Sequence, residues 1–128
     1  MDPRIREDDK GSVEEGNLLS ATTTNTIDVL LHRMVEKTAS DLHLAVGSPP
    51  TFRIDGKLVA DTEEPLAHTT IQEMIYSILD FTQRERFENE KELDFSYSVP
   101  GLSRFRGNAL LQRGTMGGGF FDAFHNVL

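Results

Sequence analysis

The sequence predicts an α+β fold in which an antiparallel sheet, built from hairpins, packs against helices on one of its faces. Stretches with apolar residues at helical spacing are interspersed with stretches in which apolar and polar residues alternate, as in half-buried strands. Two turn signals, Asp55-Gly56 and Pro100-Gly101, join successive strand-like stretches into hairpins. The expected order of elements is α-β-β-β-α-α-β-β, which is compatible with one domain in 128 residues.

A first amphipathic helix is expected from Thr26 to about Thr38, with Asn25 or Thr26 as its N-cap. Its buried face would consist of apolar residues at i, i+3, i+4, i+7 and i+8, namely Ile27, Leu30, Leu31, Met34 and Val35. A strand at about residues 41–45 should follow.

The next strand-like stretch, at about 51–60, is expected to fold back on itself at Asp55-Gly56. Both central positions of a two-residue hairpin loop need positive φ, which Asp and Gly tolerate best. Such a loop pairs Phe52 with Val59, so that Phe52, Ile54 and Val59 share one face of the sheet.

A second helix is expected after Pro65. Thr69 with Gln72, or Thr70 with Glu73, has the spacing of a capping box, in which two side chains satisfy backbone N–H groups at a helix start. The buried stripe of this helix would be Ile71, Met74, Ile75, Ile78 and Leu79.

A third, short helix is expected to end near Asn89. Thr82 and Glu85 offer another capping box at its start, and Phe87 would anchor it to the core. The dense acids that follow would lie in solvent, at the helix end and in the loop beyond: Glu88, Glu90, Glu92 and Asp94.

A second hairpin follows, turned by Pro100-Gly101. Its apolar residues alternate with polar ones on both sides of the turn: Leu93, Phe95, Tyr97, Phe105, Ala109 and Leu111. The two apolar sets share a face only if Tyr97 opposes Phe105, which requires a loop of three or five residues. A two-residue loop would place Tyr97 opposite Arg104 and split the core.

Charge and composition restrict the classes of partner. The formal net charge is -8, and residues 1–24 carry about -3 of it, from six acids against three bases. This segment lacks apolar periodicity and is expected to be a disordered tail. An acidic chain is a poor candidate for non-specific binding to nucleic acid or anionic membranes. There is no cysteine, and no apolar run approaches the ~20 residues that span a bilayer, so a cytoplasmic domain without membrane insertion is expected.

Arg104, Arg106 and Asn108 alternate with apolar residues, so they project from one face of their strand. Alternating arginines on a rigid strand can present a permanently charged, forked surface that suits phosphate oxygens. The alternative is a solvated sheet face, on which Asp94 and Ser96 across the hairpin supply partners worth about 0.5 kcal/mol each.

Asp41 and His43 also share a strand face and could be two metal ligands. Metal sites need three or four ligands, and the other histidines show no spacing that would complete the set: His32, His68 and His125. A structural hydrogen bond between Asp41 and His43 is therefore expected, and Asp41 might instead cap the turn that leaves the first helix.

The segment from Gly114 to Gly119 is rich in glycine but does not match a phosphate-binding loop. That loop requires G-x-x-x-x-G-K-[ST], and no lysine follows Lys91. A flexible turn or linker is expected. No G-x-S-x-G motif supports a nucleophilic serine either, so self-contained catalysis is not expected.

Residues 119–128 are expected to form a separate aromatic tail. Its apolar residues fall at helical spacing and would line a short terminal helix: Phe120, Phe121, Phe124, Val127 and Leu128. This helix could fold back over an open sheet edge; left exposed, the aromatic patch would promote association.

Short fragments spread over residues 26–118 resemble, in order and spacing, the N-terminal PAS-like domain of the type IV pilus retraction ATPases. The matching pieces are Ala39-Ser-Asp-Leu-His-Leu44, Gly47-Ser-Pro-Pro50, Arg53-Ile-Asp-Gly56, Pro65-Leu66, Ile75-Tyr-Ser-Ile78, Asp94-Phe-Ser-Tyr97, Val99-Pro-Gly101, Arg104-Phe-Arg106, Asn108-Ala109 and Gln112-Arg-Gly114. In that family a β-branched residue usually follows Arg-Phe-Arg. Gly107 stands there in this chain, and a glycine inside a strand weakens it by about 0.5–1 kcal/mol.

The resemblance implies a PAS-like domain over residues 25–118 that packs between neighbouring subunits of a hexameric ring. It implies that Arg106 first, and Arg104 second, contact nucleotide bound by an adjoining RecA-like motor domain. The family's other matched positions would be structural: Asp41, His43, Asp55, Gly56, Pro100 and Gly101. Because the family continues into a further strand and the Walker motifs while this sequence runs differently from Phe120, the expected domain lacks the motor and binds ATP and magnesium only through a partner.

The alternative is a stand-alone PAS-like domain that senses a small molecule or binds another protein. A sensor would hold its ligand in a cavity between the sheet and the helices, behind Phe52, Ile54 and Tyr97.

Overall fold

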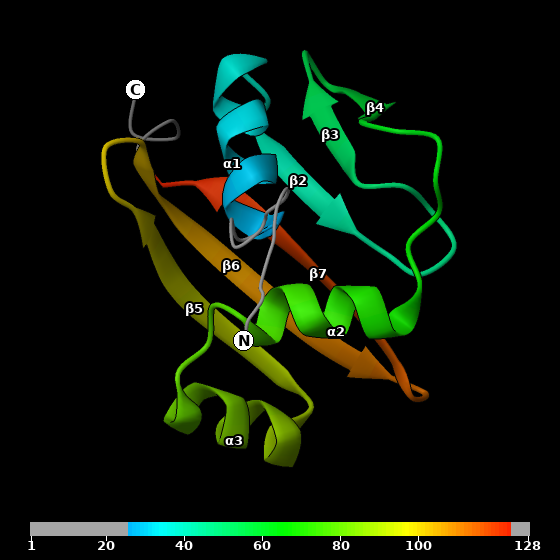
Figure 1. Cartoon of the computed structure of the whole chain (residues 1–128), viewed down its shortest axis with the longest axis vertical. Helices are drawn as coiled ribbons and strands as arrows, with labels where there is room; N and C mark the ends of the chain where they lie inside the picture. The colour runs from blue at the N-terminus through cyan, green and yellow to red at the C-terminus, as the bar shows by residue number, and fades with distance from the viewer. Residues whose placement is uncertain (1–25, 124–128) are drawn as a thin grey trace, which may run out of the picture.

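The computed structural model describes residues 26–123, which form three α-helices and a six-stranded antiparallel sheet (Figure 1). The elements are α1 (Thr26–Glu36), β2 (Asp41–Leu44), β3 (Thr51–Ile54), β4 (Lys57–Ala60), α2 (His68–Tyr76), α3 (Phe81–Glu90), β5 (Glu92–Val99), β6 (Ser103–Gln112) and β7 (Thr115–Asp122). The predicted α+β class is confirmed, with one strand more than expected. The predicted disordered tail at 1–24 and the last five residues lie outside the described part.

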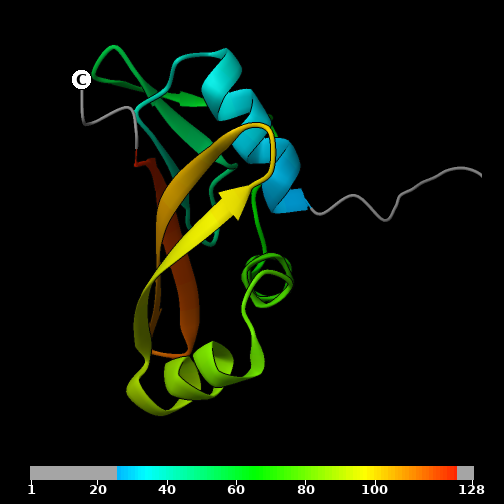
Figure 2. The same cartoon turned by 90° about the vertical axis from the view of Figure 1, so that its left-hand side faces the viewer.

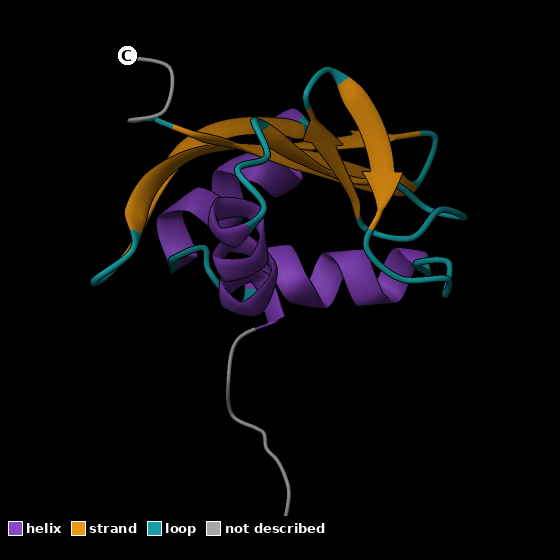
Figure 3. Ribbon diagram, turned by 90° about the horizontal axis from the view of Figure 1, so that it is seen from above, coloured by secondary structure: helices purple, strands orange, loops and turns teal. Residues whose placement is uncertain are grey.

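The strands are ordered β4-β3-β2-β7-β6-β5, so β7, the last strand within residues 26–123, lies in the middle of the sheet. All three helices lie on the same side of the sheet, as Figures 2 and 3 show. Within residues 26–123 no helix covers the opposite side, which we call the helix-free face.

The core fills the space between the helices and the sheet. Alternation along each strand points every second residue toward the helices, and α1 and α2 supply the opposing apolar side chains. The largest fully buried side chains are Phe52, Phe87, Phe105, Phe120, Ile27, Leu31, Met34, Leu42, Ile71, Ile75 and Met116. The core ends at β3, because all four residues of β4 are exposed, including Val59, which was expected to share the buried face with Phe52.

Both hairpins have the predicted geometry. Asp55 and Gly56 have φ of 52° and 79°, and Phe52 pairs with Val59. In the second hairpin Tyr97 pairs with Phe105, and a three-residue loop connects β5 to β6. The predicted register is therefore confirmed.

The helix starts differ from the predicted capping boxes. The N-cap of α2 is Ala67, which makes no side-chain cap, so neither Thr69 nor Thr70 starts the helix. In α3 the capping box is formed by Asp80 and Gln83, two residues before the pair expected from the pattern. A capping box can be matched at several neighbouring positions in a polar sequence, and packing of the following apolar residues decides which one is used.

The glycine-rich segment is a strand, so the predictions of a flexible linker and of a helix containing Phe120 and Phe121 are wrong. It forms β7, which pairs with β2 on one side and β6 on the other and crosses the boundary expected at residue 118. Gly118 fits a close approach, since a Cβ there would lie 2.6 Å from the carbonyl oxygen of Asn108 and 3.0 Å from Ile75 of α2. The strand expected to be missing from the sheet is thus present, and only the distal part of the predicted tail helix lies outside the described residues.

Candidate functional site

The helix-free face collects most of the polar residues that the sequence singled out. Strand register places the outward-facing side chains in two rows that run across the sheet. One row is Arg53, Asp41, Phe121, Arg106 and Ser96. The next row is Thr51, His43, Gly119, Asn108 and Asp94. The two motifs, on β2 and on β6, therefore lie on one surface with β7 between them.

Arg104 and Arg106 are exposed on β6 and lie opposite Ser98 and Ser96 of β5. Four other arginines of the described residues each have a carboxylate oxygen within 4.0 Å: Arg33, Arg53, Arg84 and Arg86. No such ion pair involves Arg104 or Arg106 within residues 26–123. Asp94, expected as a partner on a solvated face, makes no ion pair with either arginine.

A hollow of about 240 Å³ opens beside this arginine pair. It is lined by Asp94, Arg106, Gly107, Asn108 and Phe121. The guanidinium of Arg106 and the amide of Asn108 can donate hydrogen bonds to a ligand, whereas the carboxylate of Asp94 accepts them. An anion is therefore favoured on the Arg104 side of Arg106, where the neutral Ser96 and Ser98 lie opposite, and disfavoured next to Asp94.

Asp41 and His43 form a polar cluster with their neighbours. Asp41 is buried; Ser40 Oγ donates to its Oδ1 at 2.5 Å, while His43 Nε2 contacts its Oδ2 and Arg53 Nε lies 3.6 Å from the same oxygen. Ser40 is the last residue of the connection between α1 and β2, so the carboxylate of Asp41 accepts a hydrogen bond from a side chain of that connection, whose backbone groups otherwise bond to one another or to β3. Among the residues of the described range, no group of three potential ligands gathers for a metal ion. These contacts link β2 to β3 and to the residue before β2.

The residues behind which a sensor cavity was expected, Phe52, Ile54 and Tyr97, take part in the packing of the hydrophobic core. Phe52 is fully buried, whereas Ile54 and Tyr97 are partly buried against the core. The hydroxyl of Tyr97 donates to Asp28 Oδ1 at 2.6 Å and so ties β5 to α1.

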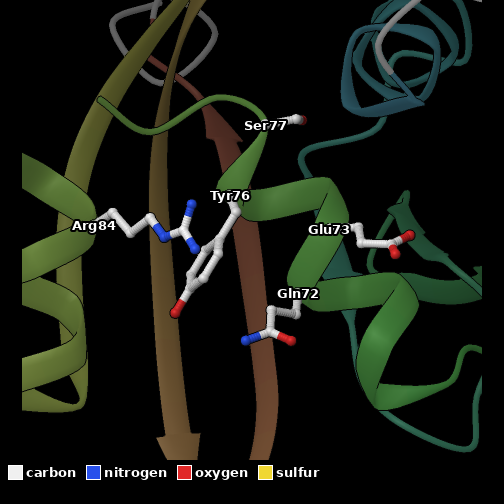
Figure 4. Close-up of a pocket in the computed structure, with 5 residues that line it drawn as sticks. All are labelled: Gln72, Glu73, Tyr76, Ser77 and Arg84. Carbon is white, nitrogen blue, oxygen red and sulfur yellow. The ribbon is translucent and has the colours of Figure 1, made fainter. Parts of the chain in front are cut away.

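A larger hollow of about 470 Å³ lies between α2 and α3, on the side of the sheet opposite the helix-free face (Figure 4). Its central groups already interact with each other. The guanidinium of Arg84 lies 4.3 Å from the centre of the Tyr76 ring, and the Tyr76 hydroxyl donates to Glu88 Oε2 at 3.1 Å. Burial raises the pKa of Tyr76. These contacts hold α2 against α3, and we do not assign the hollow a ligand.

Sequence reasoning missed Phe121 and Gly119 as parts of the site. Phe121 is 38% exposed on the helix-free face and lies directly between Asp41 and Arg106. The only local signal was that two consecutive phenylalanines, Phe120 and Phe121, follow a run of glycines, and this pattern fits a strand as well as a helix.

No protein-family model matches the chain. The chain is 44% identical over 86 residues to the type IV pilus retraction ATPase PilT of Pseudomonas aeruginosa, and 35% identical over 88 residues to the type IV pilus ATPase PilU of the same organism. These matches cover 67% and 69% of this chain but 25% and 23% of the relatives, so the chain spans about a quarter of their length.

Solved structures agree. The pilus retraction motor PilT with bound ADP superposes with a TM-score of 0.69 at 31% identity, over 78% of this chain and 29% of that one. The ATPase DotB of Legionella pneumophila superposes with a TM-score of 0.63 at 25% identity, over 75% of this chain and 28% of that one.

The fold and sequence together define a domain of the type found at the N-terminus of the type II/IV secretion ATPases. Within that superfamily the chain is related to the type IV pilus ATPases PilT and PilU, and the family resemblance expected from its motifs is confirmed. The described residues contain no helix that is both long enough and apolar enough to cross a bilayer.

Proposed function

We propose that this domain packs against a RecA-like motor domain of a neighbouring subunit in a pilus-type ATPase ring and contacts the nucleotide bound there. Arg106 would be the leading contact to the phosphates and Arg104 the second. The observation that supports this role is the pair of exposed arginines on the helix-free face, neither of which has a carboxylate partner in the described residues.

The proposed chemistry is electrostatic. Cα atoms two residues apart in a strand are separated by about 7 Å, so Arg104 and Arg106 can reach different phosphates of one nucleotide. A guanidinium delivered from a second domain stabilises the charge that develops on the transferred phosphoryl group. The sheet contributes rigidity, because pairing with β5 and β7 fixes the direction of each arginine before the partner arrives.

The motor partner would supply everything else that phosphoryl transfer needs. ATP and magnesium would be held by its phosphate-binding loop and acidic residues, and this domain by itself would not hydrolyse ATP. The PilT and PilU relatives are named as ATPases, and the structural relative PilT carries ADP.

The test uses the 128-residue chain together with the motor domain of PilT from which the matching N-terminal region has been removed. We expect the chain to stimulate ATP turnover, and Arg106→Ala to reduce that stimulation by about tenfold or more, since a charge-assisted hydrogen bond is worth about 1.5–3 kcal/mol. Arg104→Ala should have a smaller effect.

Arg86→Ala is the matched control, because Arg86 is an exposed arginine of α3 whose partner is Glu90 on the same helix. It should leave turnover unchanged. The proposal is wrong if Arg106→Ala lowers the melting temperature of the domain in proportion to the loss of turnover, or if Arg86→Ala reduces turnover equally.

A further inference from the structure

We infer that the helix-free face carries a second feature beside the arginine pair: an apolar seat, floored by Gly117 and walled by Val46 and Leu110, that receives an apolar side chain of the same motor-domain partner. This inference rests on the proposed function and adds to it the residues that hold the partner in place.

Exposed apolar side chains gather on this side of the molecule. Of the six large hydrophobic residues that are exposed in the described range, Leu58, Leu110 and Phe121 lie on the helix-free face, and Val46 lines a hollow together with Leu110. Single exposed apolar residues need no explanation, whereas adjoining ones indicate an interaction surface; Val46 and Leu110 adjoin, because they line the same hollow.

The seat is a hollow of about 260 Å³ at the end of β2 and over the β6–β7 hairpin. Ala45, Val46, Leu110 and Gly117 contribute to its lining, and Val46 and Leu110 are 39% and 45% exposed. Gly117 leaves the floor open, because a Cβ at this position would project onto the helix-free face and lie 3.2 Å from the carbonyl oxygen of Leu44. A hollow of this size is below the range of most small-molecule pockets, so a single side chain fits it better than a cofactor.

The partner follows from the position of the seat. Leu110 and Arg106 lie on the same face of β6, four residues apart, which corresponds to about 14 Å. A stable protein interface covers about 800 Å² on each partner, a patch roughly 30 Å across. A motor domain whose contact patch is centred between the arginine pair and the seat would cover both.

The surroundings of the seat match the usual anatomy of such an interface. Glu92 lies opposite Leu110 in the β5–β6 ladder, and the polar residues Gln112 and Thr115 also line the hollow. An apolar centre with a polar margin is the arrangement in which one buried anchor carries much of the binding energy. The structure thus separates two tasks: Leu110 and Val46 would hold the partner, and Arg106 would act on its nucleotide.

The test measures affinity and turnover separately. The 128-residue chain carrying Leu110→Ser or Val46→Ser is titrated into the PilT motor domain, and ATP turnover is measured once the motor is saturated. We expect each substitution to weaken binding by about tenfold or more while turnover at saturation stays near that of the unsubstituted chain. Arg106→Ala should do the reverse, with nearly unchanged affinity and low turnover at saturation.

Phe81→Ser is the matched control, since Phe81 is 78% exposed but lies on α3, on the helix side. It should change neither quantity. If Leu110→Ser binds like the unsubstituted chain while Arg106→Ala still lowers turnover, the seat is wrong and the proposed function stands. If the unsubstituted chain does not bind the motor domain, both are wrong. If Leu110→Ser instead abolishes self-association of the chain alone, the occupant is a second copy and the inference is overturned.

Discussion

At the scale of single residues, Gly107 shows how one absent Cβ organises the core. A Cβ at this position would lie 2.6 Å from Cζ of Phe95 and 3.0 Å from Cε2 of Phe120. These two rings meet edge to face, with centroids 5.9 Å apart, in the space that the glycine leaves. Edge-to-face aromatic pairs are favourable by about 0.5–1.5 kcal/mol beyond their burial, which offsets the intrinsic cost of a glycine in a strand.

Gly107→Ala is therefore expected to destabilise the domain by about 1–2 kcal/mol, because overpacking costs more than the added alanine gains in strand propensity. The measurement is the free energy of unfolding in urea. The double variant Gly107→Ala with Phe95→Leu frees the space that Cβ needs and should recover part of the loss. A more stable Gly107→Ala variant would show that the two rings can move apart at little cost.

Tyr97 makes the stability of the domain depend on pH in the alkaline range. Burial first, and then the hydrogen bond and charge of Asp28, raise the pKa of the Tyr97 hydroxyl to about 12 from its ordinary value of 10.0. The folded state thus holds this proton more tightly than the unfolded state does. Its contribution to stability is complete below about pH 10 and is lost as the pH rises from 10 toward 12.

The corresponding experiment compares the urea midpoints of the unsubstituted chain and of Tyr97→Phe from pH 8 to pH 11. The unsubstituted chain should lose stability more steeply above pH 10, and the phenylalanine variant should be flatter. The variant retains some dependence, because Tyr76 is the only other tyrosine and its pKa is raised as well. Parallel curves for the two proteins would contradict the assigned role of the Tyr97–Asp28 bond.

At the scale of elements, α3 begins at a cap that its sequence alone did not identify. Asp80 Oδ1 accepts a hydrogen bond from the backbone N–H of Gln83 at 2.7 Å, and the Gln83 side chain accepts one from the N–H of Asp80. Asp80→Ala should lower the free energy of unfolding by about 1 kcal/mol. Thr82→Ala, at the position favoured by the sequence pattern, should change it by only a few tenths. The melting temperatures of both variants distinguish the two caps, and a larger loss for Thr82→Ala would be inconsistent with the observed helix start.

The elements whose partners are close in sequence could be predicted, whereas the one whose partners are distant could not. The alternation around Pro100-Gly101 fixed the pairing of Tyr97 with Phe105, because both strands and their loop lie within one short segment. β7 pairs with β2, with Phe120 opposite Leu42, although the two residues are far apart in the sequence. Nothing in the local sequence of a glycine-rich run indicates that β2 is its partner. Glycine has low intrinsic strand propensity, so tertiary packing overrides the local preference here.

The candidate site followed the same division. Alternation along β6 sufficed to predict that Arg104, Arg106 and Asn108 share a face. Their proximity to Asp41 and His43 depends on β7 lying between β2 and β6, which only the assembled sheet reveals.

At the scale of the whole molecule, β7 is the element that joins two halves of the sheet. β4, β3 and β2 lie on one side of it and β6 and β5 on the other, and β2 makes no pairing with β6. A chain ending at residue 118, the domain boundary expected from the sequence, keeps only Leu44 of β2 opposite β7 and removes the fully buried Phe120. Removing a buried phenylalanine side chain alone costs about 3–5 kcal/mol, against a total stability of about 5–15 kcal/mol.

We therefore expect the chain of residues 1–118 to lose its cooperative thermal transition, while the chain of residues 1–123 retains one, because the second keeps every described pairing of β7. Near-ultraviolet circular dichroism during heating measures the loss of packing around the core aromatic rings directly. Phe120→Ala in the full chain separates the two causes: a cooperative but lowered transition in this variant would assign the collapse of the 1–118 chain to the broken sheet as well as to the lost ring. A cooperative transition in the 1–118 chain would mean that the helices hold the two halves of the sheet together without β7, and the helix-free face would then not need the last strand to form.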